Sequence, residues 1–158
     1  LDMLAEKVIG KIRDIKFTDK KIDYIDIEWH EAFKKLHKKI SGNGIEVGIK
    51  LSNDILTRGL RQGDVLGINE DTIIAVNIPP SKALVINVDN PNLIPKVCYE
   101  IGNKHATLFR GETDNQFITI FDEPMKIMLE KLGVSVEEKE VKFDFEKSIS
   151  SSINNHHH

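Results

Sequence analysis

The residues best suited to chemistry in this sequence are histidines that stand outside the apolar patterns. His105 follows Gly102 and Asn103, two residue types that commonly end a helix in the left-handed conformation. A side chain just beyond a helix end leaves the helix surface and is free to meet a partner. Three further histidines close the sequence, as His156, His157 and His158. Because imidazole suits nickel, copper and zinc, these residues are the candidate metal ligands.

One imidazole cannot hold a metal ion tightly. A two-fold dimer would supply a second His105, because a symmetric interface duplicates any residue near its axis. The terminal histidine run is typical either of a metal-binding tract or of part of an expression tag. Met3 is expected to be the native start, with Leu1 and Asp2 as a cloning remnant, which favours the tag. The two asparagines at 154–155 do not resemble a common linker, so both alternatives stay open.

The remaining histidines and the cysteine are expected to have no role in chemistry. His30 and His37 lie among lysines and acids, so surface positions are expected for both. Cys98 shares an apolar helical face with Ile94 and Ile101, where a thiol is expected to pack rather than react. Motifs of the types Cys-x-x-Cys, Gly-x-Ser-x-Gly, P-loop and dinucleotide glycine do not occur. We therefore expect a protein that is not an enzyme.

Composition narrows the class of protein. The chain has 158 residues, of which 40% are hydrophobic, enough for one ordinary domain or two small ones. A net charge of -3 with balanced acids and bases gives no reason to expect nucleic acid as a partner. A single cysteine excludes an internal disulfide and fits a reducing cytoplasm. We expect no membrane association and no secretory signal, because no apolar run approaches the roughly 20 residues that span a bilayer.

The first half of the chain, residues 3–78, is predicted to be an all-β domain. Asn43-Gly44 is a tight-turn signal between alternating segments, which predicts a hairpin of residues 35–41 with 45–51. Further strands are predicted around 8–12, 25–29, 65–66 and 71–77, with a loop over 52–58. The consecutive prolines at 79–80 cannot continue a strand ladder, so the domain boundary is placed there.

The second half, residues 82–145, is predicted to alternate strands and helices. Strands are expected at 83–88, 106–109, 117–120 and 134–143. Asp89 or Asn90 is expected to cap the first helix, and Asp122 the second. The resulting order, β-α-β-β-α-β, is the ferredoxin-like arrangement, so the predicted class is α+β. Residues 146–158 are rich in Ser and Asn and are expected to form a flexible tail.

Four segments, in this order, resemble one family. Residues 99–105, Tyr-Glu-Ile-Gly-Asn-Lys-His, are similar to the Leu/Ile-Gly-Asn-Arg-His signature of UreE, a urease accessory protein family. Residues 60–66 resemble its Gly-Asp-Val/Ile-Leu segment. Residues 43–49 are similar to its first-domain hairpin, and 129–134 to its last helix-to-strand passage. Together the resemblance covers roughly residues 3–145.

The resemblance implies a nickel metallochaperone, which delivers Ni(II) for assembly of the urease metallocentre. It implies an N-terminal β domain of peptide-binding type, a C-terminal ferredoxin-like metal-binding domain, and a homodimer formed through the second domain. His105 would meet its mate at the two-fold axis and bind Ni(II), and Zn(II) is expected to fit the same site. The final histidines would be a short form of the family's histidine-rich tail. The implied partners are the urease apoprotein and the urease accessory proteins, including the GTPase.

The sequence departs from the family pattern at two places. Lys104 replaces the usual arginine, which keeps the charge but not the planar fork. Residues 114–121 contain none of the extra histidines that some members carry there, so an auxiliary site is not expected.

Three alternative functions can be compared with the residues that each of them requires. A generic divalent-metal (Zn/Ni) binding protein without a urease role has the same ligands. An acylphosphatase-like hydrolase needs a glycine-rich anion loop with an arginine after its first strand, where this chain has Asp89-Asn90-Pro91. An RNA-binding module needs a basic face with aromatic residues on its central strands, and this chain is not basic.

Overall fold

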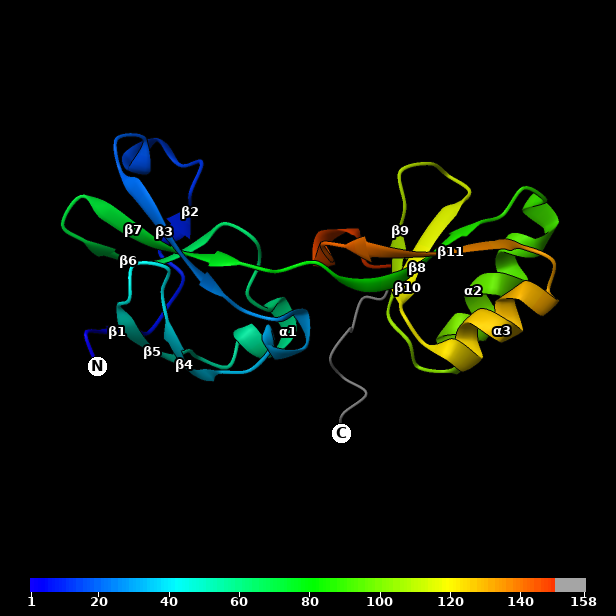
Figure 1. Ribbon diagram of the computed structural model, residues 1–158, viewed down its shortest axis with the longest axis horizontal. Coiled ribbons are helices and arrows are strands. Elements are labelled where there is room, and N and C mark those ends of the chain that lie inside the picture. The colour runs from blue at the N-terminus through cyan, green and yellow to red at the C-terminus, as the bar shows by residue number, and fades with distance from the viewer. Residues whose placement is uncertain (150–158) are drawn as a thin grey trace. The chain divides into compact units, whose positions relative to one another are not determined.

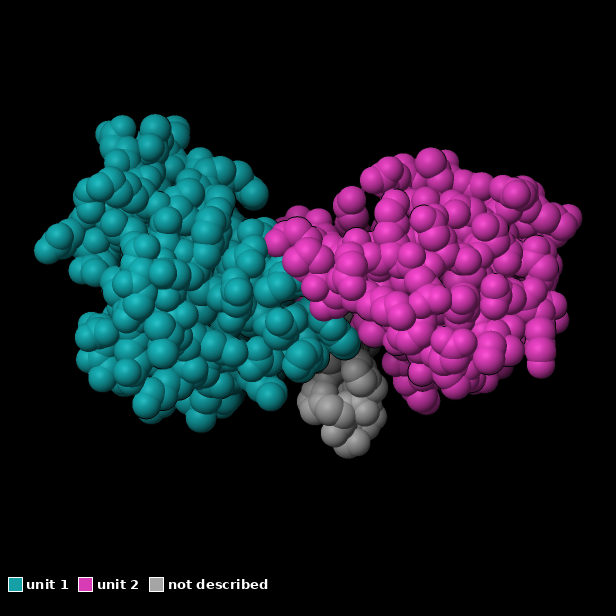
Figure 2. Space-filling view, in the orientation of Figure 1, with its two compact units in different colours: residues 1–79 teal, residues 80–158 magenta. Residues whose placement is uncertain are grey.

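The protein is described by a computed structural model over residues 1–149, with 150–158 left out of the description. The chain divides into two compact units, residues 1–79 and 80–158 (Figures 1 and 2). The division falls between Pro79 and Pro80, where neither residue can donate a backbone hydrogen bond. The fold is α+β, with a first unit made mostly of strands and a second that alternates strands with helices. No helix in residues 1–149 is long and apolar enough to cross a membrane.

The first unit contains two sheets (Figure 1). The three-stranded sheet has the order β1-β5-β4, from β1 (Met3–Ala5), β5 (Glu46–Lys50) and β4 (Leu36–Ile40). The four-stranded sheet has the order β2-β6-β7-β3, from β2 (Gly10–Lys11), β6 (Asp64–Asn69), β7 (Thr72–Asn77) and β3 (Lys21–Asp26). Strands β4 and β5 pair antiparallel, so the predicted hairpin is confirmed.

Apolar residues alternate into the interior of this first unit. In β3 and the residue after it, Ile25 and Ile27 are buried, whereas Ile22 and Tyr24 are exposed. The central strand β7 is buried on both faces, as is typical of a strand with neighbours on each side. Its fully buried residues are Ile73, Ile74, Ala75 and Val76.

Two predictions for the first unit are wrong. Residues 52–58 were expected to be a loop, but Ile55–Arg58 forms the short helix α1, with Gly59 at φ 71° after its last turn. Trp29 was expected to continue a strand, but Trp29–Glu31 forms the 3-10 helix η2. The reason is a capping box, in which Glu28 and Glu31 satisfy each other's backbone N–H groups. The capping box of η2 is a local polar contact that apolar periodicity does not report.

The second unit has the predicted ferredoxin-like order. Its elements are β8 (Ser81–Asn87), α2 (Ile94–Asn103), β9 (Leu108–Arg110), β10 (Gln116–Ile120), α3 (Glu123–Lys131) and β11 (Ser135–Val141). They form one antiparallel sheet in the order β11-β8-β10-β9. Helices α2 and α3 pack against one core with this sheet (Figure 1). That core contains Leu84, Ile86, Val88, Val97, Ile101, Leu108, Phe117, Met125, Leu129 and Val134.

The chain beyond β11 packs against β9, contrary to the expectation of a flexible tail from residue 146. Phe109 stacks on Phe143 with ring centroids 5.1 Å apart and contacts Phe145 at 5.5 Å. A 3-10 helix, η4 (Phe145–Lys147), follows, and Ser148 forms a bridge with Phe109. The two phenylalanines supply the apolar area that holds this segment, although its Ser and Lys content resembles that of a tail. The predicted tail residues 150–158 lie outside the described part of the chain.

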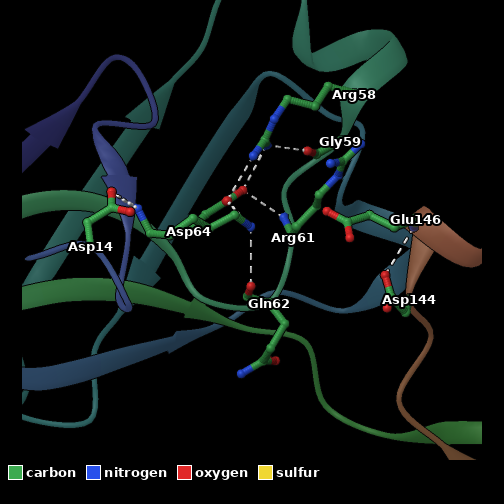
Figure 3. A network of polar contacts seen from close by, with 9 residues as sticks. Asp14, Arg58, Gly59, Arg61, Gln62, Asp64, Asp144 and Glu146 are labelled. Carbon is green, nitrogen blue, oxygen red and sulfur yellow. Dashed lines mark hydrogen bonds and ion pairs between the residues drawn. The ribbon is translucent and has the colours of Figure 1, made fainter.

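A buried carboxylate holds the first unit together around α1 and β6 (Figure 3). Asp64 is fully buried and accepts hydrogen bonds from Arg58 Nη1 and Nη2 at 2.8 and 2.9 Å. Lys11 Nζ lies 2.7 Å from Asp64 Oδ1, and the Arg61 N–H donates to Oδ2 at 2.8 Å. Burial alone would raise the pKa of Asp64, but the hydrogen bonds from Arg58 and Lys11 outweigh burial and lower it. Through the Asp64 carboxylate, this network connects β2, α1 and β6.

We predict that Asp64→Asn lowers the free energy of unfolding by about 3 kcal/mol, because it leaves two half-buried cations without the buried anion that they share. The lowered pKa of Asp64 stabilises the fold above the ordinary carboxyl value, and this contribution is lost as the pH falls below about 3.9. Urea unfolding at several pH values measures both effects. Asp71→Asn is the matched control, since Asp71 is exposed and solvent screens its pair with Lys21, so that this pair contributes little to stability. If the free energy of unfolding falls equally in the two variants, the network around Asp64 does not stabilise the fold as proposed.

Candidate metal centre

Helix α2 is fixed at its start and along its buried face. Asn90 caps a 3-10 turn, Pro91–Leu93, by accepting the Asn92 N–H at 3.0 Å, and α2 begins directly after it. Of the two predicted caps, Asn90 therefore caps the 3-10 turn that leads into α2, whereas α2 itself follows Leu93 without a side-chain cap. Val97 and Ile101, one turn apart, are fully buried in the core. The end of α2 therefore has a set direction relative to the sheet of the second unit.

The helix ends in a closed backbone turn with His105 at its key position. The His105 N–H donates to the Gly102 carbonyl at 2.9 Å, and the Ala106 N–H reaches back to the Ile101 carbonyl at 3.3 Å. This pair of bonds is the Schellman arrangement, which requires a left-handed residue at the fifth of its six positions. His105 fills that position with φ 59°. The prediction that Gly102 or Asn103 is the left-handed residue is wrong, because both lie within the helix.

The left-handed conformation has a cost that glycine would not incur. For a residue with a Cβ it costs roughly 1–2 kcal/mol, and glycine is the usual occupant of this position. Histidine tolerates the left-handed conformation better than most residues. It nevertheless gives the backbone no stabilisation that glycine at the same position would lack. A strained residue at an exposed position is typical of functional sites. The strained helix end thus marks His105 as a candidate functional residue, independently of any motif.

The imidazole of His105 is presented to solvent. His105 is exposed, as are its neighbours Asn103 and Lys104. Among residues 1–149, no hydrogen bond or ion pair to the His105 side chain is present. The same part of the chain contains no group of three or more His, Cys, Asp or Glu residues arranged to hold a metal ion.

The other candidate side chains are separate from His105 in the sequence and differ in their surroundings. His30 is exposed and lies edge-on to Trp29, with ring centroids 5.7 Å apart. His37 is half-buried rather than at the surface, with Nε2 2.9 Å from the Lys34 carbonyl oxygen, and burial lowers its pKa. Cys98 is half-buried against the core of the second unit, and burial raises the pKa of its thiol. A raised pKa disfavours the thiolate that metal ligation requires.

The described chain ends beside the strand that follows His105. The Ile149 N–H donates to the Leu108 carbonyl at 2.8 Å, at the start of β9. The predicted ligands His156, His157 and His158 lie outside the described residues. This attachment of Ile149 to Leu108 was not predicted from the sequence. Its only signal was the pair Phe143 and Phe145, whose spacing places both rings on one side of an extended chain.

Comparison with known proteins covers both units. The family described as "UreE urease accessory protein, N-terminal domain" matches residues 5–79, and "UreE urease accessory protein, C-terminal domain" matches 81–158. This chain belongs to the UreE family of urease accessory proteins. The Helicobacter acinonychis (strain Sheeba) UreE is 39% identical over 151 residues, which cover 96% of this chain and 88% of that protein. The Helicobacter pylori (strain G27) UreE is 38% identical with the same coverage. The Acetivibrio thermocellus UreE is 39% identical over 140 residues, 89% of this chain and 88% of that protein.

Membership in the UreE family gives the motifs a structural setting. The segment with the UreE-like ending, residues 99–105, forms the last turns of α2 and the left-handed turn after it. The Gly63-Asp64 segment contains the buried anion of the first unit. One UreE-like segment thus positions an exposed imidazole, whereas the other stabilises the fold. The relatives are named as accessory proteins, so the chain has an accessory role in urease maturation.

We predict that His105→Gly keeps the free energy of unfolding of the metal-free protein unchanged or raises it by up to about 1 kcal/mol, because glycine relieves the left-handed strain. His105→Val should lower it by about 1 kcal/mol, since a β-branched residue tolerates this conformation poorly. Urea unfolding in the presence of a chelator, at one protein concentration, measures both. Glu70→Gly is the control, because Glu70 is the other non-glycine residue of positive φ in residues 1–149. A loss of more than about 1 kcal/mol in His105→Gly would show that the imidazole supports the fold.

Proposed function

We propose that this protein is a nickel carrier, which binds Ni(II) between two copies of His105 and delivers it for assembly of the urease metallocentre. The observation that carries the proposal is an exposed imidazole at a left-handed position where the backbone favours glycine. Family membership supplies the urease context. The proposal requires a homodimer formed through the second unit, with His105 close to its two-fold axis.

The environment of His105 suits a site that must release its metal. A closed four-ligand cage typically serves a structural metal, whereas sites that exchange ligands keep open positions. Two imidazoles at a solvent-accessible interface leave several coordination positions for water or for a receiving protein. The half-buried Cys98, with its raised pKa, offers no competing soft ligand. Zn(II) accepts the same imidazole ligands, so we propose that it can occupy this site too.

We further propose that His156, His157 and His158 add ligands to the same centre. Ile149 is bonded to Leu108, and Leu108 lies only a short stretch of chain beyond His105. From Ile149 to His156 an extended chain reaches at most roughly 25 Å. Because Ile149 is held near His105, we propose that the terminal histidines can reach the metal centre of their own protomer. Loss of residues 150–158 should lower the number of nickel ions bound per dimer and leave the dimer intact.

The partners that we propose are the urease apoprotein and the accessory proteins that load it, including the GTPase. We place this delivery in the cytoplasm, because a single cysteine without a partner fits a reducing compartment. The competing function is divalent-metal binding without a urease role. Reconstitution separates the two: the nickel-loaded protein should activate urease apoprotein in the presence of the other accessory proteins, whereas a general metal buffer should withhold nickel from it.

We predict that His105→Ala abolishes the tightest nickel site, because symmetry removes two ligands from each dimer. Calorimetric nickel titration should be run on the native protein, on His105→Ala and on a chain that ends at Ile149. Glu70→Gly is the control, since it changes a left-handed residue in the other unit and should bind nickel normally. Sedimentation of each variant reports whether the dimer persists.

Three results would contradict this assignment. If His105→Ala keeps the tight site and the shortened chain loses it, the site belongs to the terminal histidines. If the shortened chain becomes monomeric, residues 150–158 are part of the dimer rather than a source of ligands. A tight site that persists in both variants would place the nickel ligands elsewhere in the protein.

A further inference from the structure

The hairpin turn between β4 and β5 contains two neighbouring residues that can react with each other. Asn43 is the only asparagine of the sequence that a glycine follows. In such a pair the backbone nitrogen of the glycine can attack the side-chain amide of the asparagine, because glycine has no Cβ to shield that nitrogen. Asn43 and Gly44 are exposed, and a Cβ built on Gly44 would meet no atom within 4 Å. The turn therefore places a reactive amide and an unshielded nucleophile at the surface.

The reaction closes a cyclic imide, a succinimide, within the chain. The Gly44 nitrogen forms a bond to Cγ of Asn43 while the bond from Cγ to Nδ2 breaks. The proton of the Gly44 N–H passes through water to the leaving nitrogen, which departs as ammonia. Water then opens the ring at either carbonyl group and gives aspartate or isoaspartate, in which the chain continues through the side-chain carbon. Water is the only co-reactant, so the step needs no oxidant, reductant or enzyme.

The folded turn holds this nucleophile in an unreactive state. The Gly44 N–H donates to the Ser41 carbonyl at 2.9 Å, so that loss of its proton would place an anion against a carbonyl oxygen. The Ser41 N–H donates to the Ile45 carbonyl at 2.8 Å, and the Ser41 hydroxyl accepts the Ile45 N–H at 3.0 Å. Gly44 completes this tight loop with φ 84°. The reaction therefore requires the turn to open first.

A buried carboxylate from strand β3 holds the same turn. Asp23 is 3% exposed, and its Oδ1 accepts the Asn43 N–H at 3.0 Å. The next residue of β3 adds a second contact, because the Tyr24 carbonyl accepts the Gly42 N–H at 3.0 Å. Asp23 Oδ2 is buried and has no hydrogen-bond partner among residues 1–149, which by itself destabilises a fold. The bond to Asn43 gives this carboxylate a role, because it connects the turn to the other sheet of the first unit.

We propose that Asn43 is a site of spontaneous modification, and that Asp23 sets the rate of this modification by holding the turn closed. The reaction proceeds only in molecules whose turn has opened, so its rate follows the open fraction. In the closed turn, Asp23 and Ser41 accept the backbone N–H groups of Asn43 and Gly44. Isoaspartate adds a backbone atom to the loop and cannot keep this pattern. The modification therefore loosens the hairpin of the first unit and leaves His105, in the other unit, unchanged.

The hairpin of β6 and β7 supplies an internal control. Asn69 is exposed at the end of β6, and Glu70 follows it in the turn. The side chain of Glu70 shields the backbone nitrogen that would have to attack the Asn69 amide. Asn69 should therefore stay unmodified under conditions in which Asn43 reacts.

The direct test follows the native protein during storage at constant pH and temperature. Trypsin releases residues 40–50, in which Asn43 is the only asparagine. Chromatography with mass spectrometry then separates the asparagine, aspartate and isoaspartate forms of this peptide, with a sample taken at the start as reference. The chain unfolded in urea gives the unrestrained rate. We expect the native protein to react more slowly than the unfolded chain by a factor of roughly ten or more, because hydrogen bonds hold the turn closed.

Substitutions in β3 test the role of the carboxylate. Asp23→Ala should raise the reaction rate roughly tenfold, because a hydrogen bond to a charged acceptor no longer holds the Asn43 N–H. Asp23→Asn keeps one acceptor oxygen, so its rate should lie between those of the native protein and Asp23→Ala. Asp26→Ala is the matched control, since Asp26 lies on the same strand, is exposed, and accepts a hydrogen bond from the Asn77 side chain rather than from the turn. Equal rates in Asp23→Ala and Asp26→Ala would overturn the proposal.

The native protein gives an answer even if Asp23→Ala does not fold. Opening of one turn exposes little surface, so low concentrations of urea should change the reaction rate only slightly. A rate that rises with the full urea dependence of global unfolding would overturn the proposal. So would a native protein that reacts as fast as the unfolded chain, or one in which Asn69 is converted and Asn43 stays intact.

Discussion

The backbone turn that closes α2 is the constraint on which the candidate metal centre depends. Two hydrogen bonds, from His105 to Gly102 and from Ala106 to Ile101, force residue 105 into the left-handed region. Ile101 is fully buried, so the turn is attached directly to the core of the second unit. The imidazole is therefore exposed but not loosely placed: its Cα position and direction are set by buried apolar residues. An exposed ligand with a fixed backbone is what a symmetric two-copy site requires, because each error in position is doubled by the symmetry.

The sheet of the second unit also brings the chain after β11 close to the turn that contains His105. Phe143 and Phe145 pack on Phe109 of β9, and Ile149 bonds to Leu108 at the start of that strand. Since β9 begins just after His105, the end of the described chain and the candidate ligand share one edge of the sheet. The terminal histidines, under the proposed function, thus start from a fixed point rather than from a free end. This reduces the volume they sample and raises their effective concentration at the centre.

Much of this architecture is predictable because it rests on local patterns. The Asn43-Gly44 hairpin, the caps at Asn90 and Asp122, and the alternation in β8 and β10 each follow from nearby residues. The left-handed position is not predictable in this way, because Gly102 and Asn103 were the better candidates by residue type. Tertiary packing decided the matter: burial of Ile101 extends the helix through Asn103, and the turn then falls on His105. The packing of the chain after β11 depends on long-range aromatic contacts with Phe109, which periodicity within one segment cannot report.

The two units use different physical means to combine a stable fold with an accessible surface. In the first unit a buried anion, Asp64, gathers Arg58 and Lys11 and so stabilises the unit internally. In the second unit the apolar core fixes α2, and the strain at His105 is supported by that packing. Glycine at 105 would remove the strain and with it the only imidazole that residues 80–149 possess. Under the proposed function, histidine at this position is a loss of stability accepted for the sake of a ligand.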